Sequence, residues 1–278
     1  MQIFKTKKTL SKKLNEIRNN KKIGFVPTMG SLHEGHISLI KESLKTCDIT
    51  ICSIFINPTQ FNNKNDFQNY PKSLNEDLIK LKKNNCDIAY TPDVDDLYAE
   101  NETSKEYNFG NITKVMEGKY RPGHFNGVAT VVEKFFHIIK PKKAFFGEKD
   151  LQQLQIIKKL VNQKKINIDI IGMPTIRQKN GLAKSSRNKL LSAEEKKEAA
   201  AIYQSLLYSK NNINIGIPAL KKYITKEINS KKNIKIEYVE FVELKNMNKI
   251  KKFNNKITCA ICVAAYINKI RLIDNIIL

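Results

Sequence analysis

The chain has 278 residues, of which 41% are hydrophobic and 27% are charged. This length is enough for one large domain or two smaller domains with a buried core. No apolar run approaches the ~20 residues that cross a bilayer, and the N-terminal residues lack the apolar segment of a secretion signal. These absences predict a cytoplasmic protein without a membrane partner.

Positive charge dominates the composition. The formal net charge is +22, a value that is typical of nucleic-acid-binding proteins. However, the lysines are spread along the whole chain among Asn and Ile, and aromatic residues do not alternate with them as a single-strand-binding surface requires. We therefore expect solvated lysines and no nucleic-acid partner, and keep a basic nucleic-acid-binding protein as an alternative hypothesis.

The five cysteines are few and odd in number, which argues against a disulfide framework. Cys259 and Cys262 have the spacing of a metal or redox pair, but they lie in an apolar stretch that is typical of a strand. Side chains three residues apart in a strand point to opposite faces. We expect both cysteines to be packing residues.

Apolar and amphipathic stretches alternate over the first part of the chain, a pattern that predicts a parallel α/β sheet. Loops that leave the carboxyl ends of such strands form the ligand crevice, and the Asn/Gln-rich stretch 57–72 is expected to be a loop of this kind. Ser73 and Glu76 match a capping box. The expected strands are 23–27, 49–56, 87–90, 143–146 and 168–172, and the expected helices are 34–46, 73–84, 127–139 and 150–163.

The pattern changes after Pro174. Ser192 and Glu195 form a second capping box, and the residues beyond it predict two helices followed by three β-rich runs. The chain is therefore expected to contain a Rossmann-like parallel sheet in an N-terminal domain (1–175) and a smaller α+β C-terminal lid domain (176–278). The expected helices are 193–209 and 218–230, and the expected strands are 234–244, 257–266 and 269–273.

The stretch from Pro27 to His36 connects the first expected strand to a helix. A strand, turn and helix start of this kind direct backbone N–H groups and the helix dipole at an anion. His33 and His36 share one face of the helix start, and Gly35 between them leaves room for a ligand. Zinc-protease histidines are four residues apart and need a third ligand, so phosphate binding is the better interpretation. The turn resembles the His-x-Gly-His signature of the nucleotidylyltransferases.

Three further stretches carry polar chemistry. Gly147 turns the chain after the expected strand 143–146, and Lys149 beside it can neutralise a phosphate. Asp150 is either a helix cap or a ligand contact, and both interpretations remain equally open. Ser185, Ser186 and Arg187 can surround a triphosphate, with the guanidinium giving paired hydrogen bonds. The amides of Asn57 and Gln60 can bind hydroxyl and carboxylate groups. His124, in a Gly/Pro turn, is either structural or part of the crevice.

In this order, five motifs together resemble the pantoate–β-alanine ligase family: Pro27–His36, Asn57–Phe61, Arg121–Phe125, Gly147–Asp150 and Ser185–Asn188. The resemblance covers nearly the whole chain and is strongest over 23–190. It implies an ATP-dependent ligase that converts pantoate to pantoyl adenylate with release of pyrophosphate. The amine of β-alanine then displaces AMP. The resemblance also implies Mg²⁺ as a cofactor and a homodimer.

The same resemblance implies the roles of individual residues. His36 would be the proton donor, assisted by His33, Lys149 and Arg187; Gln60, Gln153 and Asn57 would bind the substrates; and Asp77 is a candidate magnesium ligand. The residues expected to contact ATP are Met29, Gly30, Ser31, Leu32, His33, Glu34, Gly35, His36, Gly147, Glu148, Lys149, Asp150, Ile176, Lys184, Ser185, Ser186 and Arg187.

Two residues depart from the family pattern. Lys184 stands where the family usually has Met, which adds a charge beside the expected triphosphate. Leu151 stands where a Tyr is expected after Asp150, which removes a hydroxyl. The enzymatic alternative is a nucleotidylyltransferase that adenylates a different small acid.

Overall fold

The computed structural model describes residues 1–278, the side chain of Lys64 excepted, and the chain forms two compact units. We expected residues 110–120 and 149–152 in the first domain, but they group with the second unit. Unit 1 comprises Met1–Phe109, Arg121–Glu148 and Gln153–Pro174, and unit 2 comprises Gly110–Tyr120, Lys149–Gln152 and Thr175–Leu278.

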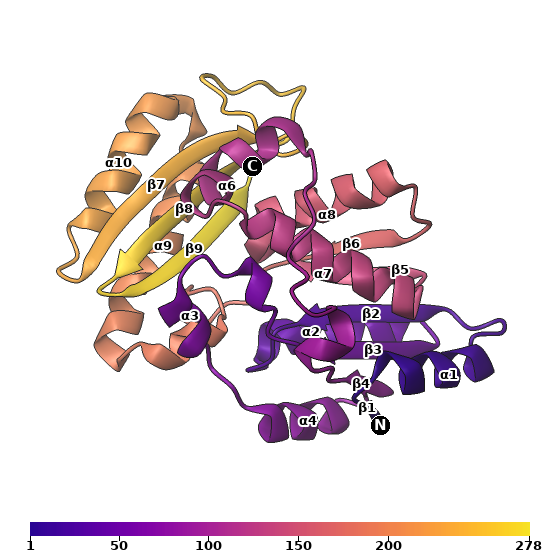
Figure 1. Ribbon diagram of the computed structural model, residues 1–278. Coiled ribbons are helices and arrows are strands. Elements are labelled where there is room, and N and C mark those ends of the chain that lie inside the picture. The colour runs from indigo at the N-terminus through magenta and orange to yellow at the C-terminus, as the bar shows by residue number, and fades with distance from the viewer. The chain divides into compact units, whose positions relative to one another are not determined.

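Unit 1 is built on a six-stranded parallel sheet with the strand order β1-β4-β3-β2-β5-β6 (Figure 1). The chain leaves β2 toward β3 on one side, whereas β5 pairs with the other side of β2. This reversal is the topological switch point at which Rossmann-like sheets bind ligands. The strands are β1 (Gln2–Phe4), β2 (Ile23–Thr28), β3 (Ile49–Ile54), β4 (Ile88–Tyr90), β5 (Lys143–Gly147) and β6 (Asp169–Met173).

Helices cover this sheet. Phe25 of β2 is fully buried and packs edge-on against Phe135 and Phe136 of α7, with ring centroids 5.5 and 6.4 Å apart. The capping box that we expected at Ser73 is wrong, because its side chain makes no cap bond. The helices that belong wholly or mainly to unit 1 are α1 (Lys7–Ile17), α2 (Glu34–Thr46), α3 (Lys64–Gln68), α4 (Leu74–Lys83), α5 (Val94–Leu97), α7 (His124–Ile139) and α8 (Leu151–Lys164), with the 3₁₀ turn η1 (Pro58–Gln60). The 3₁₀ turn η3 (Glu148–Asp150) has its first residue in unit 1 and its other two in unit 2.

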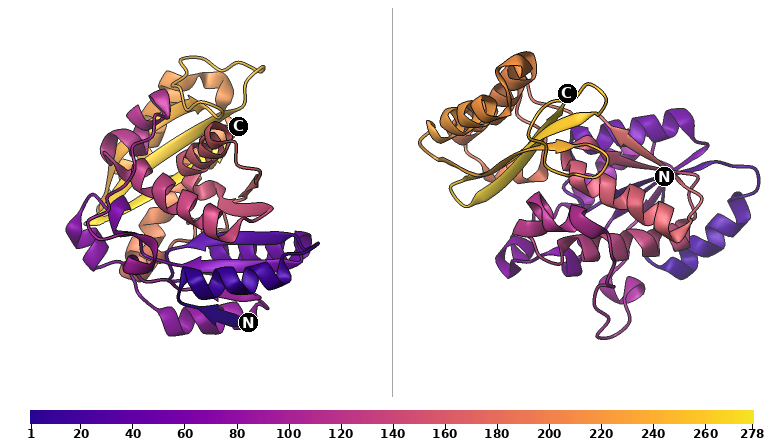
Figure 2. Two further views of the ribbon diagram at one scale, coloured as in Figure 1. Left: turned by 45° about the vertical axis from the view of Figure 1, so that its right-hand side comes forward. Right: turned by 90° about the horizontal axis from the view of Figure 1, so that it is seen from above.

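Unit 2 contains a three-stranded antiparallel sheet in the order β7-β8-β9, with α9 and α10 packed against it (Figures 1 and 2). The helices bury Leu206, Leu220 and Ile224 in one core with Val239 and Ile261 of the sheet. The predicted α/β fold class with a small α+β part is confirmed. The elements are β7 (Ile234–Glu243), β8 (Cys259–Ile267), β9 (Ile270–Ile277), α6 (Met116–Tyr120), α9 (Ala193–Asn211) and α10 (Ile217–Asn229), with the 3₁₀ turns η2 (Gly110–Lys114), η4 (Ser186–Leu190) and η5 (Ile213–Ile215).

The expectation that Cys259 and Cys262 are packing residues is confirmed. Cys259 and Cys262 lie in β8, both buried, and neither forms a disulfide. Burial raises the pKa of the Cys262 thiol to about 12, so it stays protonated and packs as a small apolar residue.

In the described part of the chain, no helix combines the length and apolar character that a membrane crossing requires.

Candidate active site

The turn that follows β2 has an unusual backbone. Gly30 has φ +82° and Ser31 has φ +50°, both in the left-handed region. For Ser31 this conformation costs on the order of 1 kcal/mol, so other contacts must hold it. Asp77 of α4 supplies them: its fully buried carboxylate accepts hydrogen bonds from Ser31 N and Leu32 N, each 2.7 Å long.

These bonds bear on the predicted magnesium ligand. Both oxygens of Asp77 already accept from backbone N–H groups, and the Ser73 hydroxyl lies 3.3 Å from each oxygen. Among the described residues, no group of three or more His, Cys, Asp or Glu side chains could hold a metal ion. The arrangement favours a structural role for Asp77 over magnesium binding.

His33 and His36 stand at the start of α2. His33 is the N-cap, and its Nδ1 accepts from Gly35 N at 3.1 Å; Nδ1 of His36 accepts from His33 N at 3.3 Å. Because each Nδ1 is an acceptor, the proton of each neutral ring lies on Nε2. The ring centroids are 4.0 Å apart, so two N–H donors lie side by side at the N-terminus of a helix, where anions are favoured.

The amide loop after β3 contacts this turn. Gln60 of η1 places its Nε2 at 3.1 Å from Met29 Sδ, while its Oε1 accepts from Asn57 Nδ2 at 3.2 Å. The structure therefore brings Met29, expected to contact ATP, together with Gln60, expected to bind pantoate. Gln153 lies half-buried on α8 and, among the described residues, has no hydrogen bond to this network.

A buried polar network fixes the amide loop. Asn57 is 1% exposed; its Nδ2 also donates to Gly127 O at 3.0 Å, and its Oδ1 accepts from the Tyr98 hydroxyl at 2.8 Å. Burial raises the pKa of the Tyr98 phenol, so this group remains a donor. Buried His124 donates from Nδ1 to Gln60 O at 2.9 Å, which gives His124 a structural role.

Two members of this network were not predicted. A Cβ atom on Gly127 would lie 2.5 Å from Thr59 O and 2.7 Å from Gln60 N, so only glycine permits this approach of α7 to the loop. The glycine-containing stretch 121–128 carried a signal for this contact. Tyr98 carried none, because nothing near it in the sequence indicates a partner 41 residues away.

The remaining site residues on the β5 side divide between the units. Gly147 ends β5 and Glu148 follows it in unit 1, whereas Lys149 and Asp150 group with unit 2. Lys149 Nζ lies 3.6 Å from Asp150 Oδ1. Asp150 ends η3, and α8 begins after it at Leu151.

The other predicted ATP contacts lie on a hairpin of unit 2. Lys184 N donates to Ile176 O at 2.8 Å, and Gly181 turns the hairpin with φ +94°. Ser185 then caps η4 by accepting from Arg187 N at 3.3 Å. The structure thus brings Ile176 beside Lys184 and holds the Ser/Arg stretch in a defined turn.

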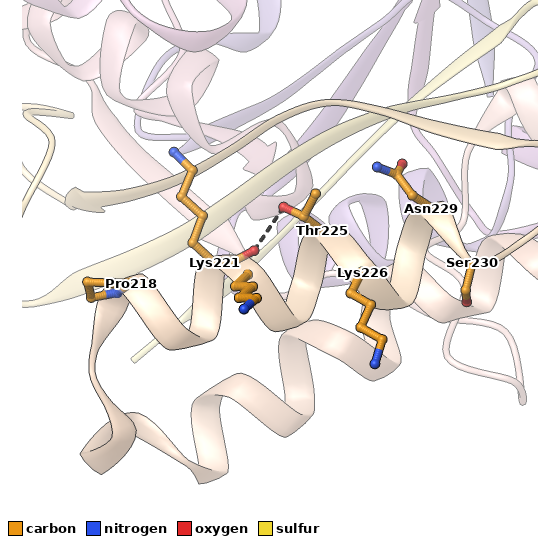
Figure 3. Close-up of a pocket in the computed structure, with 7 residues that line it drawn as sticks. Pro218, Lys221, Thr225, Lys226, Asn229 and Ser230 are labelled. Atoms are coloured by element: carbon orange, nitrogen blue, oxygen red, sulfur yellow. Dashed lines mark hydrogen bonds between the residues drawn. The ribbon is translucent and has the colours of Figure 1, made fainter.

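A separate depression on unit 2 contains none of the predicted site residues. Figure 3 shows it along α10, where lysine side chains extend from the helix surface. The hydrogen bond marked in Figure 3 joins the Thr225 hydroxyl to Lys221 O at 2.8 Å. We interpret this face as solvated. The residues that line it are Pro218, Lys221, Lys222, Thr225, Lys226, Asn229 and Ser230.

Comparison with known proteins agrees with this geometry. The family model for pantoate-beta-alanine ligase matches residues 2–277. Pantothenate synthetase of Azobacteroides pseudotrichonymphae is 46% identical over 99% of both chains, and that of Christiangramia forsetii is 42% identical over 100% of this chain and 99% of its own.

Solved structures give the same result. Pantothenate synthetase from Thermus thermophilus has a TM-score of 0.92 and 32% identity, with 99% of both chains covered. Pantoate-beta-alanine ligase from Francisella tularensis, complexed with beta-gamma ATP and beta-alanine, has a TM-score of 0.84 and 40% identity over 99% of this chain and 97% of its own. This chain belongs to the pantoate–β-alanine ligase family.

Proposed function

We propose that this chain joins pantoate to β-alanine at the expense of ATP, through a pantoyl-adenylate intermediate, and releases AMP and pyrophosphate. The contact between Gln60 and Met29 carries the proposal, because it joins a neutral amide loop to the turn that bears His33 and His36. Amides suit a hydroxy acid and imidazole N–H groups suit phosphate oxygens. The family membership of the chain supports the same reaction.

In the first step, a pantoate carboxylate oxygen attacks the α-phosphorus of ATP. The new O–P bond forms as the bond between the α-phosphorus and the bridging oxygen breaks, and pyrophosphate leaves with the electron pair. The Nε2–H groups of His33 and His36 donate to phosphate oxygens that gain charge. Gln60 and Gln153 orient the carboxylate, because this reaction depends on alignment and charge stabilisation. Asn57, expected to bind substrate, instead holds Gln60, since both Nδ2 hydrogens are donated within the protein.

In the second step, the β-alanine amine attacks the carbonyl carbon of the adenylate. The C–N bond forms, the C–O bond to AMP breaks so that AMP leaves with the electron pair, and the proton of the amine passes to solvent water. Gln60 would also bind the amine donor; Asn57 Nδ2 holds its side-chain amide oxygen, and His124 Nδ1 holds its backbone carbonyl. The Francisella tularensis relative, complexed with beta-alanine, supports this step.

We further propose that residues of unit 2 bind ATP. Lys149, Ser185, Ser186 and Arg187 would contact phosphates, and Ile176 would contact the adenine, so that residues 176–278 act as a lid. Mg²⁺ would enter with the ATP phosphates, which suits a chain whose described residues provide no metal cluster. A cytoplasmic homodimer completes the proposal.

ATP–pyrophosphate exchange tests the first step by itself. The purified chain should exchange labelled pyrophosphate into ATP only when pantoate is present, without β-alanine. Addition of β-alanine should then release AMP and form pantothenate. Exchange that requires a different hydroxy acid, or no acid, would overturn the proposed substrate.

A further inference from the structure

An ion pair in unit 2 joins the half-buried Arg177 to the buried Asp274. Arg177 donates two hydrogen bonds to Asp274, from Nη1 at 2.6 Å and from Nη2 at 2.9 Å. Asp274 is 5% exposed, and the guanidinium carbon of Arg177 lies 3.6 Å from the centre of the Tyr203 ring. A paired and stacked guanidinium of this kind has little freedom to move.

The same arginine holds the hairpin that leads to Lys184. Nη1 of Arg177 donates to Gly181 O at 3.1 Å, and the backbone of Arg177 pairs with Ala183 across the hairpin. The hairpin that precedes the predicted phosphate-binding residues is therefore held in place within unit 2.

Asn275 extends this network to a second predicted ATP contact. Its backbone N donates to Asp274 Oδ1 at 2.8 Å, and its carbonyl accepts from Arg177 Nη2 at 3.3 Å. Its side-chain Nδ2 then donates to Lys149 O at 2.9 Å, and the residue is only 6% exposed. One buried network therefore touches both ATP-binding segments that we assign to unit 2, although they are far apart in the sequence.

We propose that Asn275 is a positioning residue for Lys149 in the adenylation step, an inference that rests on the proposed function. Its amide fixes the carbonyl of Lys149, and with it the point from which the lysine side chain extends. Only an uncharged donor of this length makes the bond, since a carboxylate would face the carbonyl with a second acceptor. Small displacements of a group that aligns a reacting phosphate cost large factors in rate.

Asn275→Asp tests the proposal, since it keeps the shape of the side chain and removes the donor. We expect kcat for pantoate-dependent pyrophosphate exchange to fall about 10-fold, with KM for pantoate unchanged. Asn246→Asp is the matched control: its Nδ2 donates to Glu243 Oε2 at 2.6 Å, also in unit 2, and exchange should stay at the wild-type rate. Asn275→Ala replaces Asn275→Asp if circular dichroism shows that the aspartate variant is unfolded.

A double-mutant cycle with Lys149→Ala separates positioning from a general structural role. In the Lys149→Ala background, Asn275→Asp should change exchange by less than about twofold. Fully additive losses would overturn the proposal, as would a wild-type rate for Asn275→Asp alongside an impaired Lys149→Ala. If Lys149→Ala itself exchanges at the wild-type rate, the role assigned to Lys149 under the proposed function fails instead.

Discussion

Asp77 holds Ser31 in a left-handed conformation: Ser31 N donates to Asp77 Oδ2 at 2.7 Å, and Ser31 has φ +50°. The two residues are 46 positions apart in the sequence. The turn that presents His33 and His36 therefore depends on a buried carboxylate from α4. A charge that accepts two backbone hydrogen bonds in a buried site stabilises the turn, whereas its loss leaves two buried donors unsatisfied.

Asp77→Ala should lower the free energy of unfolding by roughly 2–5 kcal/mol, because Ser31 N and Leu32 N lose their acceptor. Asp77→Asn should lower the free energy of unfolding by less, since its amide oxygen can still accept one of the two hydrogen bonds. Urea unfolding measures both, and Glu76→Ala, a solvent-exposed neighbour on α4, is the control that should stay within about 0.5 kcal/mol of wild type. If Asp77→Asn unfolds like wild type but needs more Mg²⁺, the metal-ligand interpretation replaces the structural one.

His36→Gln separates the donor role of His36 from its capping role. Gln is preferred at this place in a capping box, so α2 should keep its start and the unfolding temperature should change little. The imidazole Nε2–H is lost, and pantoate-dependent exchange should fall by ~10²-fold. His36→Ala should show the same kinetic loss with an additional loss of stability. Wild-type exchange by His36→Ala would remove His36 from the mechanism, whereas activity in His36→Gln alone would show that the amide donor replaces the imidazole.

Sequence patterns predicted the elements that have both periodicity and a clear start. α2 begins and ends at the predicted residues, since an amphipathic stretch follows the His33 cap. By contrast, β1 has only three residues, and α1 buries only Leu10 and Leu14 among its lysines, so neither carries a periodic signal strong enough to predict. The stretch 57–72, expected to be a loop, contains η1 and the short α3.

The site was predictable as a set of motifs but not as a network. Residue types and spacing indicated Gln60 and the two histidines. The contacts that fix them come from Asp77, Tyr98 and Gly127, which are remote in sequence and carry no periodic pattern. The same holds for residues 110–120 in unit 2, where Gln152 Nε2 donates to Ile112 O at 2.6 Å. A single side-chain hydrogen bond of this kind produces no hydropathy pattern from which it could be predicted.

The hydrogen bonds of Glu133 lead to a prediction of how the free energy of unfolding depends on pH. Burial opposes its charge, but hydrogen bonds from Lys105 Nζ at 2.9 Å and Tyr107 Oη at 2.8 Å hold its pKa below the usual value. A carboxyl with a lowered pKa in the folded state stabilises the fold above its unfolded pKa, and this stability is lost as the pH falls through the folded pKa. The difference in unfolding free energy between wild type and Glu133→Gln should therefore shrink as the pH is lowered from about 6 to about 3.

Glu106→Gln is the control for this prediction, since Glu106 is solvent-exposed in the same unit. The difference in unfolding free energy between Glu106→Gln and wild type should stay small across the same range of pH. A difference for Glu133→Gln that is constant with pH would show that its neighbours do not favour the charged form.

Gly127→Ala should act on pantoate binding through the backbone of the amide loop. The added Cβ would lie 2.5 Å from Thr59 O and 2.7 Å from Gln60 N, and backbone cannot yield as a flexible side chain does. We expect Gln60 to shift and KM for pantoate in the exchange assay to rise about 10-fold. Gly216→Ala in unit 2 is the control: its φ of +85° makes alanine costly, yet its Cβ meets only Pro218 Cδ at 3.9 Å, so stability should fall without any change in KM. A KM that rises equally in both variants would assign the effect to lost stability rather than to the position of Gln60.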